Sequence, residues 1–165
     1  MQVQSFKLRG YKPIVGVVLK QGAARVLLQS IPTDYALDGF QQLLDTRLTS
    51  SCTEWERQKA LVLQLKGVFP LAVPPYPVES DYELFRMLRD TQELIGIYIR
   101  NDTFLAGRVR QVNAASFQLH LLSTKGQWLD IHSFRFQRIK IIDAGTDYLH
   151  SLHLLAAHNE GVKAR

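Results

Sequence analysis

Short segments in which apolar and polar residues alternate fill the stretch from Leu94 to Ile142. Apolar or aromatic side chains at every second position are typical of half-buried strands. The separators are Asn101-Asp102, residues 113–115 and residues 123–126, mostly residues that accept turns at low cost. Because a bent sheet that curls on itself also hides its edges, these short strands predict a small β-barrel. The predicted strands are Leu94 to Arg100, Phe104 to Val112, Ser116 to Leu122, Trp128 to Ser133 and Phe134 to Ile142.

The first third of the chain shows a weaker form of the same pattern, followed by a helix. Ile14 to Lys20 and Arg25 to Ile31 predict two strands, and Phe40 to Leu48 is weaker strand material. Thr53 and Glu56 form a capping box, in which each side chain satisfies a backbone donor, so a helix is expected from Thr53 to Gly67. The side chains expected to face inward from this helix are Trp55, Leu61, Val62 and Leu65.

Residues 68–79 hold four of the six prolines and are expected to lack regular structure, because proline removes a donor and restricts its predecessor. They are the expected boundary between a domain at 1–67 and a domain at 80–165. A second capping box, Ser80 with Glu83, predicts a helix from Asp81 to Thr91. A last helix is expected at 146–157, with Tyr148, Leu149, Leu152 and Leu155 inward.

The two halves share an order of features that indicates an internal repeat. Residues 26–28 (VLL) correspond to residues 119–121 (LHL). Further on, 53–55 (TEW) correspond to 146–148 (TDY), and each of these triplets opens a helix soon after the last strand. The sequence therefore predicts two copies of one barrel-plus-helix unit, of which the first is the more divergent.

The second unit resembles an Sm-like barrel, the fold of the Sm, LSm and Hfq proteins, in which a helix precedes five bent strands. The first motif of that family has a strand leucine, a glycine eight residues on, an aliphatic two later and an acidic or amide residue four beyond. Here Ile99, Gly107, Val109 and Asn113 stand at these positions. In the family the next loop has a Met-Asn pair whose amide contacts RNA bases, and the resemblance places Gln118 at the Asn. The second motif, an Arg-Gly beside an aliphatic residue, is not matched by residues 134–138 (FRFQR).

The expected fold is therefore mainly β with short α-helices: two small, strongly bent five-stranded Sm-like (SH3-like) barrels, each associated with a helix. The chain divides into a divergent barrel plus helix at 1–67, a proline-rich linker at 68–79 and a better-preserved barrel with flanking helices at 80–165. Sm-like proteins assemble into rings through the edges of their barrels. The resemblance thus implies a homo-oligomer formed through barrel edges.

Basic residues gather in the second half of a chain whose formal net charge is +5. Residues two apart on a strand point to one face, so neighbouring strands would bring two such pairs into a basic ribbon that contacts phosphates. The competing interpretation is the solvated face of half-buried strands. Gln118 and His120 also share a face, from which they could read or stack bases. The candidate nucleic-acid-binding residues are Arg108, Arg110, Asn113, Gln118, His120, Arg138 and Lys140.

No catalytic residues, metal ligands or cofactors are predicted. The sequence has no phosphate-binding glycine loop, no Gly-x-Ser-x-Gly elbow and no Cys-His signature. His150 and His153 lie one helical turn apart without evident further ligands, which favours a polar helix face over a zinc site. The lone Cys52 indicates a reducing compartment, and no segment is long enough to span a membrane, so we expect a cytoplasmic protein.

These observations support two hypotheses from different classes. The first is a non-enzymatic Sm-like module that binds RNA or acts as an oligomeric scaffold. The alternative is a protein-interaction module that binds a partner through its sheet edges and binds no nucleic acid. Nucleic acid that co-purifies with the protein favours the first, and a stoichiometric protein partner favours the second.

Overall fold

The computed structural model describes residues 2–44, 49–99 and 103–163. Within them, ten strands and three α-helices confirm the prediction of a mainly β protein with short helices. The strands are β1 (Val3–Lys7), β2 (Ile14–Gln21), β3 (Val26–Ser30), β4 (Phe40–Leu43), β5 (Thr49–Ser51), β6 (Leu94–Ile99), β7 (Thr103–Val112), β8 (Ser116–Leu122), β9 (Trp128–Arg135) and β10 (Ile141–Ala144). The helices are α1 (Glu54–Leu65), α2 (Asp81–Thr91), α3 (Asp147–Lys163) and the short 3-10 turn η2 (Phe136–Arg138).

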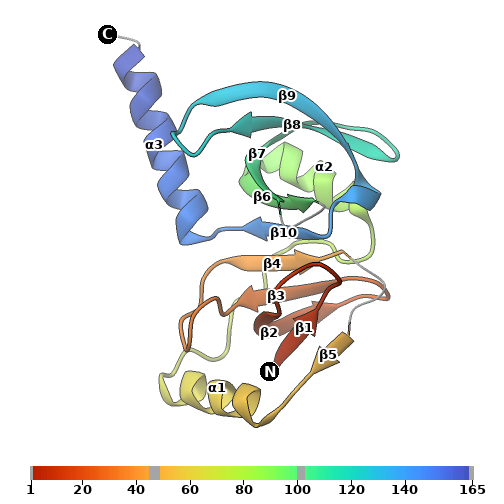
Figure 1. The fold of residues 1–165 in the computed structure, drawn as a ribbon, viewed down its shortest axis with the longest axis vertical. Coiled ribbons are helices and arrows are strands. Elements are labelled where there is room, and N and C mark those ends of the chain that lie inside the picture. The colour runs from red at the N-terminus through yellow and green to blue at the C-terminus, as the bar shows by residue number, and fades with distance from the viewer. Residues whose placement is uncertain (1, 45–48, 100–102, 164–165) are drawn as a thin grey trace.

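The described strands pair into one antiparallel sheet in the order β5-β1-β2-β3-β4-β10-β6-β7-β8-β9 (Figure 1). The two halves repeat the same order, because the fifth strand of each, β5 or β10, pairs with the first, β1 or β6. The halves are joined where β10 also pairs with β4, with Ile141 opposite Leu43 and Ala144 opposite Phe40. The sheet is therefore continuous and open, with β5 and β9 at its ends, and two closed barrels are not shown.

The helices begin where the capping residues predict. The hydroxyl of Thr53 accepts a hydrogen bond from the Trp55 N–H at 3.3 Å, and the carboxylate of Glu56 accepts one from the Thr53 N–H at 2.6 Å, which closes the expected capping box. Ser80 caps α2 by accepting from the Glu83 N–H at 3.4 Å, and the predicted bounds of this helix are confirmed. No helix among the described residues is long and apolar enough to cross a membrane.

The predicted inward face of α1 is wrong at three of its four positions, and at the fourth Val62 is partly buried. Trp55, Leu61 and Leu65 are 48%, 56% and 77% exposed, whereas Leu63 and Lys59 are buried. The reason is a polar contact that periodicity cannot show: the Lys59 ammonium donates to the Asp34 carbonyl and lies 4.9 Å from the centre of the Trp55 ring. Burying Lys59 against the loop after β3 turns the apolar residues of α1 toward solvent.

The prediction for α3 is right for two of its four positions. Leu149 and Leu152 are buried against Leu94 and Ala106 of the sheet. By contrast, Tyr148 and Leu155 are 48% and 40% exposed. The helix therefore contacts the sheet along a narrow stripe, and Figure 1 shows its C-terminal end extending beyond the strands.

Residues 68–79 lack helix and strand, as predicted, yet they pack into the core, and we call them the strap. Tyr76 and Val78 are buried in the same cluster as Leu27 of β3. The Lys20 ammonium of β2 donates to the carbonyls of Pro74 and Tyr76 at 3.1 and 3.3 Å. The strap is thus held against the sheet of the first half while it leads into the second.

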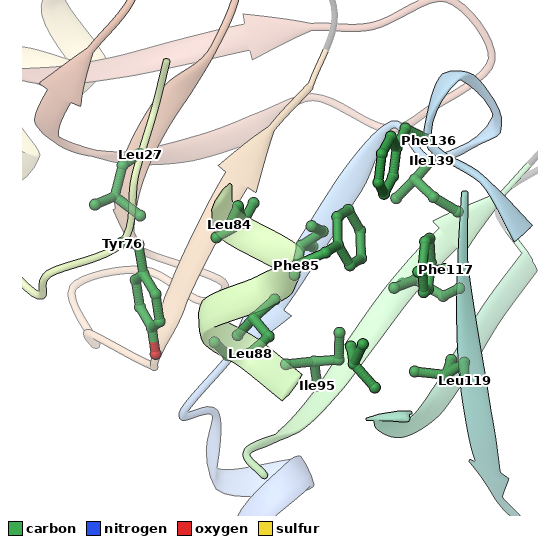
Figure 2. Packing of buried hydrophobic residues seen from close by; sticks show 14 of the residues in the cluster. Leu27, Tyr76, Leu84, Phe85, Leu88, Ile95, Phe117, Leu119, Phe136 and Ile139 are labelled. Carbon is green, nitrogen blue, oxygen red and sulfur yellow. The ribbon is translucent and has the colours of Figure 1, made fainter. Parts of the chain in front are cut away.

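The largest core cluster contains residues from both halves of the chain. Figure 2 shows Leu27 and Tyr76 on one side of α2, and Phe117 and Phe136 on the other. The ring of Phe85 on α2 stacks on that of Phe117 at a centroid distance of 4.0 Å and an interplanar angle of 21°. Helix α2 therefore fills the concave face of the curved sheet and is central to the core.

Candidate functional site

Three of the predicted nucleic-acid-binding residues lie together on one face of β7 and β8. Arg108 of β7 is directly opposite His120 of β8 in the strand register. Arg108 lies two residues after Ala106 and His120 lies two residues before Leu122, and both Ala106 and Leu122 pack against α3. Arg108 and His120 therefore extend the face of the sheet that α3 partly covers.

Arg108 is held by an aromatic ring and a histidine. Its guanidinium carbon lies 5.2 Å from the centre of the Trp128 ring, and its Nη2 is 3.1 Å from Nδ1 of His153 on α3. A guanidinium only donates, so this contact is a hydrogen bond when Nδ1 of His153 is the acceptor. The Nε of Arg108 is buried and has no hydrogen-bond partner among the described residues. The Nε–H of Arg108 is thus a buried donor that no described residue satisfies.

Arg110 makes a second arginine–histidine contact, with His120, from a β-bulge in β7. The register between β7 and β8 shifts between Val109 and Gln111, which marks a bulge at Arg110. Its Nη2 lies 3.0 Å from Nδ1 of His120, and its Nη1 donates to Oε1 of Gln92 at 3.3 Å. The ring centre of His120 is in turn 4.7 Å from that of Trp128. We call Arg108, Arg110, His120, Trp128 and His153 the arginine–histidine cluster.

Asn113 and Gln118 continue this face toward the β7–β8 hairpin. Gln118 lies two residues before His120 on β8 and is paired with Gln111 of β7. The side-chain amide of Gln111 donates to Oδ1 of Asn113 at 3.4 Å, and the Asn113 N–H donates to the Ser116 carbonyl at 2.7 Å. Asn113 and Gln118 therefore form a polar strip beside the cluster, which contains the other three predicted residues of β7 and β8.

Arg138 and Lys140 lie elsewhere, and the predicted strand Phe134 to Ile142 is wrong. The chain leaves β9 at Arg135, makes the turn η2 and enters β10 only at Ile141. Arg138 is exposed at the end of η2, and the Lys140 N–H donates to the Tyr98 carbonyl at 3.1 Å. The four basic residues do not form a ribbon on neighbouring strands, because β6 lies between β7 and β10.

An open groove of about 550 Å³ lies beside the cluster, between α3 and the end of α2. Arg108 and His153 line it from one side and Asp38 from another. Asp38 lies in the loop before β4, and its Oδ1 accepts a hydrogen bond from the Asp147 N–H at the start of α3 at 2.7 Å. Among the described residues, no three His, Cys, Asp or Glu side chains are grouped closely enough to hold a metal ion.

Sequence reasoning did not place Trp128 and His153 in this site. Trp128 was predicted as the first residue of a strand, and His153 was expected on a polar helix face. Trp128 is partly buried, but its ring packs against Arg108 and His120. The signal for Trp128 was its position in the strand next to His120, whereas His153 could be assigned only once the packing of α3 on the sheet was known.

The two end strands of the sheet differ in character. At one end β5 has three residues, all of them exposed. At the other, β9 has eight residues and exposes the apolar side chains Leu129 and Ile131 at 49% and 53%. β9 also exposes Asp130 and Arg135, and its length together with these two apolar side chains favours pairing with another strand.

No protein-family model matches the chain, and no curated protein or solved structure is significantly similar to it.

Proposed function

We propose that the chain is a non-enzymatic Sm-like module with two barrels in tandem, which binds single-stranded RNA through the arginine–histidine cluster. The observation that carries this proposal is the convergence of Arg108, Arg110 and His120 on one face with Trp128. Guanidinium groups form charge-assisted hydrogen bonds with phosphates, and they offer planes on which unpaired bases stack. The strip formed by Gln118 and Asn113 adds amides that can hydrogen-bond to base edges.

The repeated strand order supports the Sm-like part of the proposal. Helix α2 precedes β6 to β10, the order of helix and five strands that the Sm-like fold has. In each half the fifth strand returns to pair with the first. Each set of five strands is then one barrel unit, and the β4–β10 pairing is the contact between the two units.

Titration of a fluorescently labelled single-stranded RNA tests the RNA proposal. We expect binding in low salt that weakens as salt is added, because each neutralised phosphate releases counterions. Arg110→Gln is the informative variant, since Arg110 is exposed and its loss leaves the core intact. Its slope of log affinity against log salt should fall by about 0.7, the contribution of one phosphate contact on a single strand.

Arg57→Gln is the matched control, because Arg57 is an exposed arginine on α1, outside the cluster. It removes the same charge and should leave the slope unchanged. Arg138→Gln then shows whether the RNA path extends to η2. Absence of binding in low salt, or equal losses in the Arg57 and Arg110 variants, would contradict the RNA proposal.

The apolar edge of β9 favours a second candidate function, a scaffold that binds a protein through its sheet ends without nucleic acid. Leu129 and Ile131 offer apolar side chains beside unpaired backbone groups, as a strand-adding partner requires. Absorbance of the purified protein at nucleic-acid wavelengths, together with its mass in solution, separates the two candidates. Protein without nucleic acid in a complex of defined stoichiometry supports the scaffold.

A further inference from the structure

A pocket of about 260 Å³ lies where the two halves of the sheet meet, apart from the arginine–histidine cluster. Its floor is formed by consecutive strands: Gln41 of β4, Asp143 of β10, Tyr98 of β6 and Phe104 of β7. Tyr148 in the first turn of α3 closes one side. The remaining lining residues are Ser30, Pro32, Asp38 and Thr146.

The centre of this pocket is a buried carboxylate. Asp143 is 7% exposed, and its two oxygens accept hydrogen bonds from the Gln41 amide at 2.9 Å and the Tyr98 hydroxyl at 3.1 Å. Among the described residues no lysine, arginine or histidine forms an ion pair with Asp143. Its charged neighbour is Asp38, of the same sign. A buried charge without a counterion is costly, so the pocket is electrostatically complementary to a cation.

The walls indicate which kind of cation fits. The ring of Phe104 is 5.1 Å from that of Tyr98 and 5.7 Å from that of Tyr148, at interplanar angles of 64° and 69°. Phe104 packs edge to face against both tyrosines, and the faces of aromatic rings attract large, weakly hydrated cations. Calcium or magnesium would instead require six or more oxygen ligands, and among the described residues no three His, Cys, Asp or Glu side chains are grouped closely enough to hold a metal ion.

We propose that this pocket, between Asp143 and the rings of Tyr98, Phe104 and Tyr148, binds an alkylated ammonium group. The methyl groups lie against the three rings, and the positive charge faces the Asp143 carboxylate, with Asp38 adding negative potential from the loop before β4. This site shares no side chain with the arginine–histidine cluster and does not depend on the proposed RNA binding.

Tetramethylammonium chloride is the probe, followed by ligand-observed NMR or calorimetry at pH 8 on the intact chain. Neopentyl alcohol, of similar size but neutral, is the matched ligand control. We expect saturable binding of the cation and none of the alcohol. Asp143→Asn should weaken binding by more than about tenfold, because it removes the charge that faces the cation. Tyr148→Leu should weaken it about fivefold through loss of one ring.

The pH dependence provides a second readout. Burial raises the pKa of Asp143 to about 6. Affinity for the probe should therefore rise about tenfold between pH 5 and pH 7, as the carboxylate ionises. The side chains that face Asp143 from the packed elements are uncharged: Gln41, Tyr98, Phe104 and Tyr148. The charged group that faces it is Asp38, in the loop before β4. Asp143→Asn should show no such rise.

Asp130→Asn is the control for the charge, because Asp130 is an exposed aspartate on β9. It should bind the probe as the wild type does. Thermal melting confirms that each variant is folded, and Tyr148→Leu, at a half-exposed helix position, carries the test if Asp143→Asn does not fold. Any one of the following results overturns the proposal: unchanged binding in the folded variants, equal binding of the alcohol, displacement of the probe by calcium, or no binding at tens of millimolar probe.

Discussion

At the scale of single residues, Asp143 is the most perturbed carboxyl group that the structure describes. Burial is the main cause that raises its pKa from the ordinary 3.8 to about 6, and the hydrogen bonds from Gln41 and Tyr98 offset part of that shift. A raised folded-state pKa means that the folded protein holds this proton more tightly than the unfolded chain. The resulting stabilisation is complete below about pH 4 and is lost as the pH rises through 6.

We therefore expect Asp143→Asn to be more stable than the wild type at neutral pH. Relative to this variant, the free energy of unfolding of the wild type should fall by about 2–3 kcal/mol between pH 4 and pH 7. Urea unfolding at several pH values measures the difference. Asp130→Asn serves as the control, and a wild type whose stability parallels that of Asp143→Asn at every pH would contradict the assignment.

At the scale of elements, the strap shows that a segment without regular structure can be part of the core. Its carbonyls at Pro74 and Tyr76 are bound by one ammonium, that of Lys20. Hydrogen bonds from a charged donor contribute about 1.5–3 kcal/mol each at most, and partial exposure reduces this. Lys20→Met keeps the aliphatic stem of the side chain and removes only the donors.

Lys20→Met is expected to lower the free energy of unfolding by about 1–2 kcal/mol, because the two strap carbonyls lose their donor. Lys12→Met, at an exposed position before β2, is the matched control and should change stability by less than about 0.5 kcal/mol. Denaturant unfolding of both variants makes the comparison. Equal effects of the two would mean that the strap is held by apolar packing of Tyr76 and Val78 alone.

At the scale of the whole molecule, local sequence signals predicted several of the strands and the helix starts, whereas their spatial arrangement came from contacts between distant residues. Period-two alternation located β6, β7 and β8, and hydroxyl caps located α1 and α2. The exposed face of α1 was mispredicted because Lys59 is buried by a loop, and periodicity treats every lysine as exposed. The pocket at Asp143 was missed because Gln41, Tyr98 and Tyr148 meet only when β10 pairs with both β4 and β6.

From the pairing of β4 with β10 we derive a prediction for association between copies of the chain. Within one chain, the fourth strand of the first half pairs with the fifth strand of the second. The strands in equivalent positions at the two ends of the sheet are β9 and β5. If β9 of one copy pairs with β5 of the next, the contact within the chain is repeated between chains. Such a head-to-tail interface either closes into a ring or extends into a filament.

Ile131→Lys tests this assembly, because Ile131 is 53% exposed on β9 and a charged residue on an edge strand opposes pairing. The wild type should have a mass in solution of several chains, and the variant should shift toward the mass of a single chain, as light scattering after size exclusion measures. Leu61→Lys, a 56% exposed leucine on α1, makes the same kind of change away from the sheet ends and should leave the mass unchanged. A wild type that is already monomeric, or an assembly that only the Leu61 variant disrupts, would show that β9 is not the interface.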